Sequence, residues 1–152
     1  MSSVEDFAIT ANRDYETCLL MESRFPEEFA ISTASFHIQQ AVERILKADI
    51  LLMGSNPEHT HSIRKLSEEC TKLGLHMPKG LDDIADSLTI WESSNRYDSY
   101  ITFSKDKYDT AKNVYLELKC YFEMYMKAIK DLNEEDSELE EDKDYDGPQM
   151  TM

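Results

Sequence analysis

Glycine and proline are scarce in this sequence, with only 4 of each among 152 residues. Sandwiches and barrels need many tight turns, and tight turns depend on these two residues, so both folds are disfavoured. The few glycines also argue against a glycine-rich phosphate loop, and no Gly-x-Ser-x-Gly segment marks a hydrolase nucleophile. An apolar content of 41 % is enough for one core in a chain of this length. We therefore expect a single helical domain.

Cysteine is also rare, and long hydrophobic runs are missing. The three cysteines, Cys18, Cys70 and Cys120, are widely spaced and lie on or beside apolar helix faces, which predicts buried reduced thiols rather than disulfides or a zinc ribbon. The N-terminal segment lacks the basic and apolar regions of a signal peptide. The apolar-rich stretch 45–53 is far too short to cross a membrane. We expect a cytoplasmic protein with no cofactor.

Basic residues are outnumbered, and the excess of acid is concentrated at one end. The formal charge is −15, and residues 134–152 hold nine acidic residues and one lysine, a net charge of −8. With almost no apolar residues, this segment buries too little surface to offset its ordering entropy. We predict an all-α domain over 1–133 and a disordered acidic tail over 134–152. The folded part is then only mildly acidic.

Apolar residues recur at three- and four-residue steps in five segments, which is typical of an up-and-down helical bundle of about five helices. The steps are clearest in the second segment, and Gly54 follows it as a helix end. Thr60 is the predicted N-cap of the third segment and Gly74 its predicted end. The fifth segment is apolar on more than one side, so it needs more than one neighbour or a dimer partner. The predicted helices cover roughly 4–24, 28–53, 61–73, 81–95 and 105–132.

A polar stripe on the second predicted helix is the main candidate site. His37, Gln40, Arg44 and Lys47 follow one another at steps of three, four and three, and Glu43 lies beside Lys47 one turn away. Arginine could hold phosphate oxygens in a fork and lysine could add a point charge, so the stripe could bind a nucleotide. The alternative is a solvated or dimer-facing stripe with Glu43 paired to Lys47.

Two further polar groups lie at helix ends. His61 and Arg64 open the third predicted helix, where an anion could bind, or His61 could be a structural residue of its turn. His59, His61 and His76 lack the spacing of a zinc site, so no metal is expected. At the end of the fourth predicted helix, three residues either complement the helix dipole or turn back to join the stripe: Asn95, Arg96 and Tyr97.

One segment is more specific than a helical pattern. Residues 36–48 read FHIQQAVERILKA, and Gly54, Pro57 and Thr60-His61 follow. Together with residues 95–97 and residues 11–14, which contain an Asp, this combination resembles the HEPN domain family of small helical bundles. The resemblance covers most of 8–130. Two positions depart from the family's pattern: Ser62 replaces a common Asp, and Asp98 replaces a common Pro.

The resemblance implies a bundle that often forms dimers, sometimes binds nucleotides and often works with a small nucleotidyltransferase. Many HEPN proteins are RNases that carry an arginine, then four to six residues, then a histidine, and no arginine of this chain has a histidine at that spacing. We therefore expect a non-catalytic homodimeric module that binds a nucleotide or RNA, or supports a nucleotidyltransferase partner in a toxin–antitoxin or defence system. The alternative is an RNase or nucleotide-processing enzyme with an unconventional site.

Overall fold

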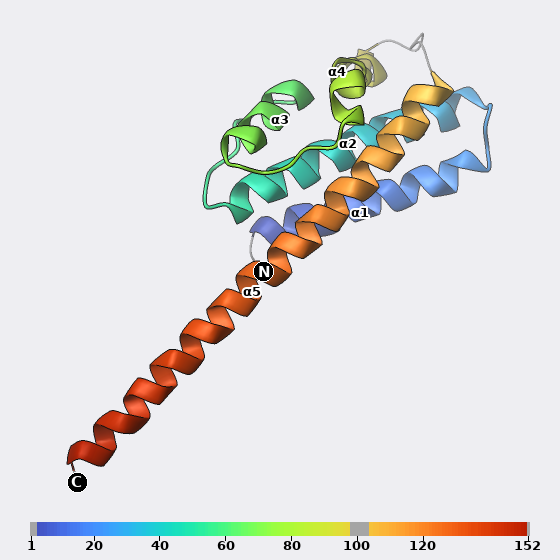
Figure 1. Ribbon diagram of the computed structural model, residues 1–152. Coiled ribbons are helices and arrows are strands. Elements are labelled where there is room, and N and C mark those ends of the chain that lie inside the picture. The colour runs from blue at the N-terminus through green and yellow to red at the C-terminus, as the bar shows by residue number, and fades with distance from the viewer. Residues whose placement is uncertain (1–2, 98–103, 152) are drawn as a thin grey trace. The chain divides into compact units, whose positions relative to one another are not determined.

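The structure, a computed structural model, describes residues 3–97 and 104–151, and it describes side chains for 3–92 and 104–135. These residues form helices and connecting turns without any strand, which confirms the predicted all-α fold of about five helices. In chain order, and as labelled in Figure 1, the helices are α1 (Ser3–Glu22), α2 (Glu28–Leu52), α3 (Ile63–Lys72), α4 (Gly80–Tyr97) and α5 (Lys105–Thr151).

The chain divides into two compact units, one ending at Cys120 and the other beginning at Tyr121, within α5. α5 continues to Thr151, whereas the fifth helix was expected to end near 132. The residues that follow, 133–151, include five Glu, a residue of high intrinsic helix propensity. The domain boundary at 133 and the disorder of the acidic tail stay predictions.

Helix α2 is the central element of the first unit. It packs against α1, α3 and α4, and buried residues follow it from its first turn to its last (Figure 1). A helix covered by several neighbours buries more than one face. That explains why α2 buries polar side chains as well as apolar ones, namely Ser35, Gln39, Gln40, Glu43 and Asp49.

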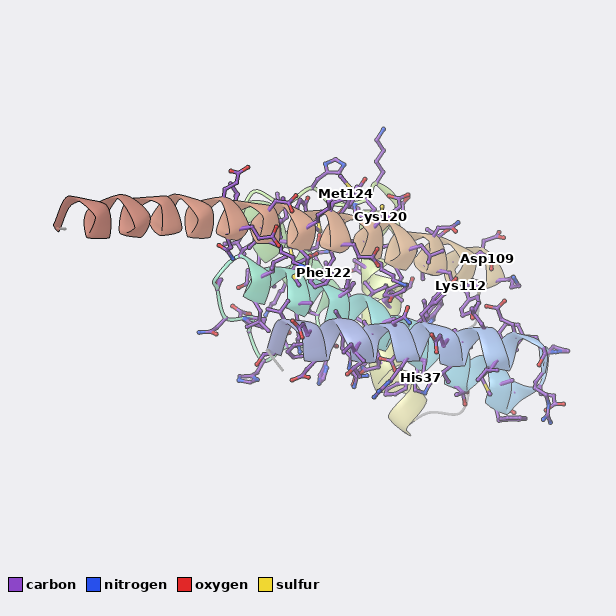
Figure 2. The ribbon with its side chains drawn as sticks, turned by 90° about the horizontal axis from the view of Figure 1, so that it is seen from below. His37, Asp109, Lys112, Cys120, Phe122 and Met124 are labelled. Carbon is purple, nitrogen blue, oxygen red and sulfur yellow. The ribbon has the colours of Figure 1, made fainter. Side chains whose placement is uncertain are left out.

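The first part of α5 packs against α1 through aromatic and polar contacts. The rings of Tyr15 and Tyr115 stack with centroids 5.1 Å apart. Near the end of α1, Glu22 Oε2 accepts hydrogen bonds from Tyr108 Oη at 2.8 Å and Lys112 Nζ at 2.6 Å. Figure 2 shows Lys112 on α5 pointing toward α1. These contacts join residues more than eighty positions apart in the sequence.

Two local expectations were wrong. The N-cap of α3 is Ser62, whose Oγ accepts a hydrogen bond from Lys65 N at 3.3 Å, and Thr60 instead accepts from Ser62 N at 3.1 Å. Cys18 and Cys70 are buried free thiols as expected, but Cys120 is exposed (Figure 2). The buried residues nearby are Leu118 and Phe122, which lie two positions before and two positions after Cys120.

Asp49 is an acidic residue in the core. It is 1 % exposed, and neither carboxylate oxygen has a hydrogen-bond partner. Burial penalises the charged form and raises the pKa of Asp49 to about 7. Burial therefore favours the protonated, neutral form of Asp49 in the folded protein. The midpoint of its titration lies close to neutral pH.

Candidate functional site

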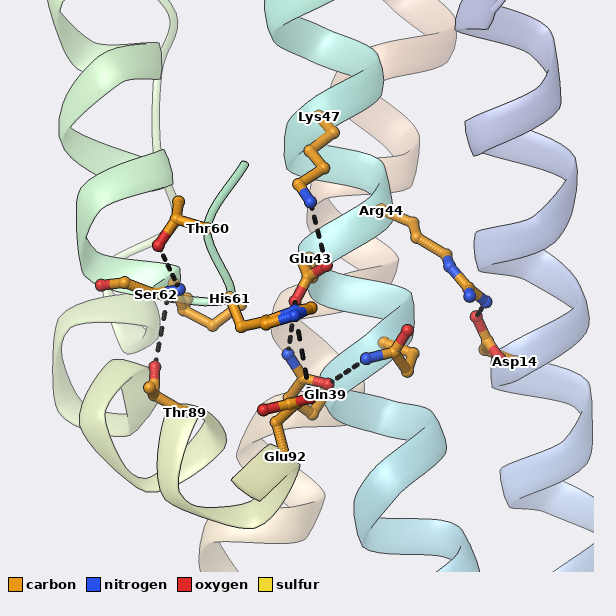
Figure 3. A network of polar contacts seen from close by, with 12 residues as sticks. Asp14, Gln39, Glu43, Arg44, Lys47, Thr60, His61, Ser62, Thr89 and Glu92 are labelled. Atoms are coloured by element: carbon orange, nitrogen blue, oxygen red, sulfur yellow. Dashed lines mark hydrogen bonds and ion pairs between the residues drawn. The ribbon is translucent and has the colours of Figure 1, made fainter. Parts of the chain in front are cut away.

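The polar residues of α2 separate into two clusters on opposite sides of that helix. Figure 3 shows Arg44 reaching toward Asp14 on α1, whereas Lys47 points along α2 toward Glu43. The predicted stripe is therefore not one continuous surface. His37 and Arg44 belong to the cluster with α1, and Gln40, Glu43 and Lys47 belong to the cluster near α3 and α4.

The cluster between α1 and α2 is built around Asp14. This carboxylate is 6 % exposed, and its two oxygens take different partners: His37 Nδ1 lies 2.7 Å from Oδ1, and Arg44 Nη1 donates to Oδ2. The shared acid fixes both side chains, which come from positions two turns apart on α2. The His37 and Arg44 side chains keep 29 % and 31 % of their surface exposed, so both reach the solvent.

A pocket opens beside this cluster. It has a volume of about 320 Å³ and is lined by Arg44 of α2 together with Ser3, Asp6, Phe7 and Thr10 of α1. Three of these α1 residues precede Asp14 at helical steps, which places them along the same side of α1. The guanidinium of Arg44 thus combines a fixed anchor on Asp14 with access to a pocket.

The second cluster is built around the buried Glu43. Its Oε1 accepts from Gln39 Nε2 at 2.8 Å and lies 3.0 Å from His61 Nδ1, and its Oε2 accepts from Lys47 Nζ at 3.1 Å (Figure 3). Gln40 Nε2 donates to Gln39 Oε1 at 2.6 Å. The expected pairing of Glu43 with Lys47 is present, and the Lys47 side chain is only 13 % exposed.

His61 is the exposed member of the second cluster. Its side chain is 52 % exposed, and Nδ1 also lies 4.0 Å from Glu92 Oε1 of α4. A carboxylate only accepts hydrogen bonds, so Nδ1 carries the proton and Nε2 of the neutral ring keeps a lone pair. The same reasoning applies to His37 beside Asp14. Each imidazole is oriented by a buried acid.

The start of α3 offers fewer free donors than its sequence suggests. Ser62 N donates to Thr60 Oγ1, Ile63 N donates to Thr89 Oγ1 at 3.2 Å, and Lys65 N donates to Ser62 Oγ. Arg64 turns toward α4, where its Nε donates to Asp86 Oδ1 at 3.1 Å. An anion here would compete with contacts the chain already makes, so the structure gives this end of α3 little support as an anion site.

Three predicted site residues, Asn95, Arg96 and Tyr97, lie at the end of α4, and their side chains are outside the described residues. Among the side chains that are described, no group of three or more His, Cys, Asp or Glu is arranged to hold a metal ion. Likewise, no helix within the described ranges is long and apolar enough to cross a membrane.

Sequence reasoning noted Asp14 within the segment 11–14 of the family resemblance but did not include it among the candidate site residues. The sequence did carry a signal, because Phe7, Ala11, Asp14, Cys18 and Met21 share the three- and four-residue steps of the apolar face. An acid on such a face has to be paired to be buried. The pocket residues Ser3, Asp6 and Thr10 had no comparable signal, since short polar residues are common in the first turns of any helix.

The fold and the two clusters together define a small helical module that brings oriented histidines and basic side chains to its surface. Residues 5–125 match the family model of the HEPN domain. The chain belongs to the HEPN domain family. Among curated proteins and among solved structures, none matches the chain significantly.

Proposed function

We propose that this HEPN chain is a non-catalytic module that binds a nucleotide in the pocket between α1 and α2. The observation that carries the proposal is Arg44. One nitrogen of its guanidinium is fixed by the buried Asp14, and the same group lines the pocket. A pre-oriented arginine keeps further N–H donors for phosphate oxygens and loses little conformational entropy on binding.

The other cations are less suited to phosphate. Lys47 is mostly buried and holds Glu43, and Arg64 is held by Asp86. A phosphate at either place would have to displace a carboxylate of this chain. Arg44 differs because its partner is shared with His37, so Asp14 keeps a second contact if the guanidinium shifts toward a ligand.

Calorimetric titration with ATP, GTP and a short RNA at low and high salt tests this proposal. Arg44→Ala should weaken binding by about 1–3 kcal/mol, the scale of a lost charge-assisted hydrogen bond. The effect should shrink at high salt, because screening weakens exposed phosphate contacts. Circular dichroism checks that the variant still folds, since it removes one partner of a buried acid.

Lys47→Ala is the matched control. It removes the same charge from the same helix, one turn away, but from a residue that faces Glu43 rather than the pocket. Its effect on binding should be much smaller than that of Arg44→Ala. Equal losses in the two variants would mean that only overall charge matters, and absence of binding below about millimolar would exclude the nucleotide function.

The proposal includes self-association and a nucleotidyltransferase partner. Large apolar side chains on α1 and α5 support an interface: Leu20 is 69 % exposed, Leu19 is 44 % exposed and Leu116 is 41 % exposed. Burying such residues against a second copy or a partner removes apolar surface from water. Sedimentation at high micromolar concentration should give a dimer, and a purely monomeric chain with no partner recovered from cells would contradict this part.

The two oriented histidines favour a second candidate, an RNase that lacks the usual motif. His37 and His61 each keep Nε2 available as a proton acceptor, which a general base for a ribose hydroxyl requires. If RNA is cleaved above background and His37→Ala or His61→Ala abolishes cleavage, the chain is an enzyme. Cleavage that persists in both variants would point to a contaminating nuclease.

A further inference from the structure

The pocket between α1 and α2 has charges of opposite sign among its lining residues. Arg44 comes from α2, and Asp6, an exposed acid in the first turn of α1, is the lining residue with the opposite charge. The other nearby acid, Asp14, is buried and already holds Arg44 and His37. Asp6 is therefore the carboxylate that a bound molecule can reach.

The remaining lining residues are compatible with a base beside that carboxylate. Phe7 is half-buried, so its ring is held in place and offers an aromatic surface to a purine. The hydroxyl of Thr10 donates to the main-chain oxygen of Asp6 at 2.7 Å, which occupies its proton within α1. The strongest acceptor left in the pocket is the Asp6 side chain, and it accepts only.

A carboxylate distinguishes the purines by their hydrogen-bonding edges. Guanine presents two adjacent donors, N1–H and the exocyclic N2 amine, which match the two oxygens of one carboxylate. Adenine presents one amine beside the N1 lone pair, and that lone pair repels a carboxylate placed against the same edge. Asp6 is exposed, so water partly compensates such a mismatch, and the preference between the two purines is modest.

Building on the nucleotide pocket argued above, we propose that it selects guanine over adenine nucleotides and that Asp6 is the residue that selects. Arg44 holds the phosphates, Phe7 packs against the base, and Asp6 accepts from N1–H and N2–H of guanine. In this proposal Asp6 determines only which base is preferred, whereas Arg44 determines whether the nucleotide binds. The effects of the two residues can therefore be measured separately.

Calorimetric titration of the full chain with GTP, ATP and ITP measures this selection. GTP should bind about tenfold or more tightly than ATP, the ratio that one charge-assisted hydrogen bond and one avoided repulsion produce. ITP lacks the N2 amine but keeps N1–H, so its affinity should lie between the other two. GTP and ATP binding with equal affinity would overturn the selection while leaving the nucleotide function intact. If none of the three binds, both proposals fail.

Asp6→Asn is the decisive variant, and Glu5→Gln is its control. Both remove one acid from the first turns of α1, but only Asp6 lines the pocket. Asp6→Asn should reduce the preference for GTP over ATP to within about threefold, because an amide pairs with either edge. Glu5→Gln should leave the ratio unchanged. A ratio that changes equally in both variants, or in neither, would show that Asp6 does not read the base.

Discussion

Asp49 places a titratable group where charge is poorly tolerated. Its pKa is raised from 3.8 to about 7 by burial, so the folded protein holds the proton over a pH range in which the unfolded chain has lost it. In that range the folded state binds more protons than the unfolded state, and stability therefore falls as pH rises. The loss begins near pH 4 and is complete above about pH 7.

Asp49→Asn should remove this dependence on pH. The amide resembles the protonated acid in size and carries no charge, so the variant should match the wild type near pH 4 and exceed it near pH 8. The gain is at most about 4 kcal/mol, from three pKa units at 1.36 kcal/mol each. Thermal unfolding of both proteins from pH 4 to pH 8 measures it.

Asp83→Asn is the control for that experiment, because Asp83 is an exposed acid on α4. Because the Asp83 side chain is exposed, its replacement should shift the unfolding temperature only slightly. The difference in stability between the wild type and Asp49→Asn is the quantity to compare. If this difference is the same at pH 4 and pH 8, Asp49 does not carry the proton in the folded state.

At the scale of the element, α3 depends on its N-cap. Ser62 Oγ satisfies one main-chain donor of the first turn, so Ser62→Ala should cost about 1 kcal/mol of stability. Ser62→Asp keeps the cap and adds a negative charge at the positive end of the helix, so it should match or exceed the wild type. Denaturant unfolding of the three proteins measures this order. An Ala variant as stable as the wild type would mean that the cap contributes nothing.

This capping role explains one departure from the family's pattern. The resemblance implies an Asp where Ser62 stands, and both residue types cap helices through a side-chain oxygen. The replacement therefore preserves the local structure. It also explains why the start of α3 was expected two residues too early: Thr60 and Ser62 are both good caps, and sequence alone does not say which of them the main chain uses.

The helices could be predicted to the extent that their patterns were strong. The second segment was expected over 28–53 and α2 spans Glu28–Leu52, because a long apolar face leaves little freedom at either end. α5 was expected to end near 132 but continues to Thr151, although Asn133 is a residue type found at helix ends.

The residues of the candidate site could be predicted from the sequence, but which of them contact one another could not. His37, Arg44 and Lys47 are on α2 as expected, yet Arg44 joins Asp14 of α1 and Lys47 joins Glu43. Spacing along one helix says which side chains share a face, but long side chains choose partners from neighbouring helices. Asp14 was part of the segment 11–14 that carries the family resemblance, and its place on an apolar face indicated that it is buried and paired.

At the scale of the whole molecule, the acidic end of the chain should contribute little to stability. Acids recur there at four-residue steps, where like charges repel in a helix. Removing residues 134–152 should therefore leave the melting temperature within about 2 °C.

Differential scanning calorimetry of the full and shortened chains makes this comparison, with a low-salt arm to maximise charge effects. A small rise in the melting temperature at low salt would fit the repulsion just described. A fall of more than about 5 °C would contradict the prediction, because a change that large requires contacts worth roughly 1 kcal/mol or more in a domain of this size.

The contacts between α1 and the first part of α5 also bear on how the chain folds during synthesis. Tyr108 and Lys112 contact Glu22, and Lys119 contacts Asn12, at sequence separations of 86 to 107 positions. Contacts at such separation form late and slow the search for the native state. While the ribosome is still translating the middle of the chain, α1 and α2 can pack together. The side chains of α1 that contact α5 in the folded protein are still exposed to water at that stage. The nascent protein therefore completes its fold only after most of the chain has left the exit tunnel, and until then its incomplete core is open to chaperones.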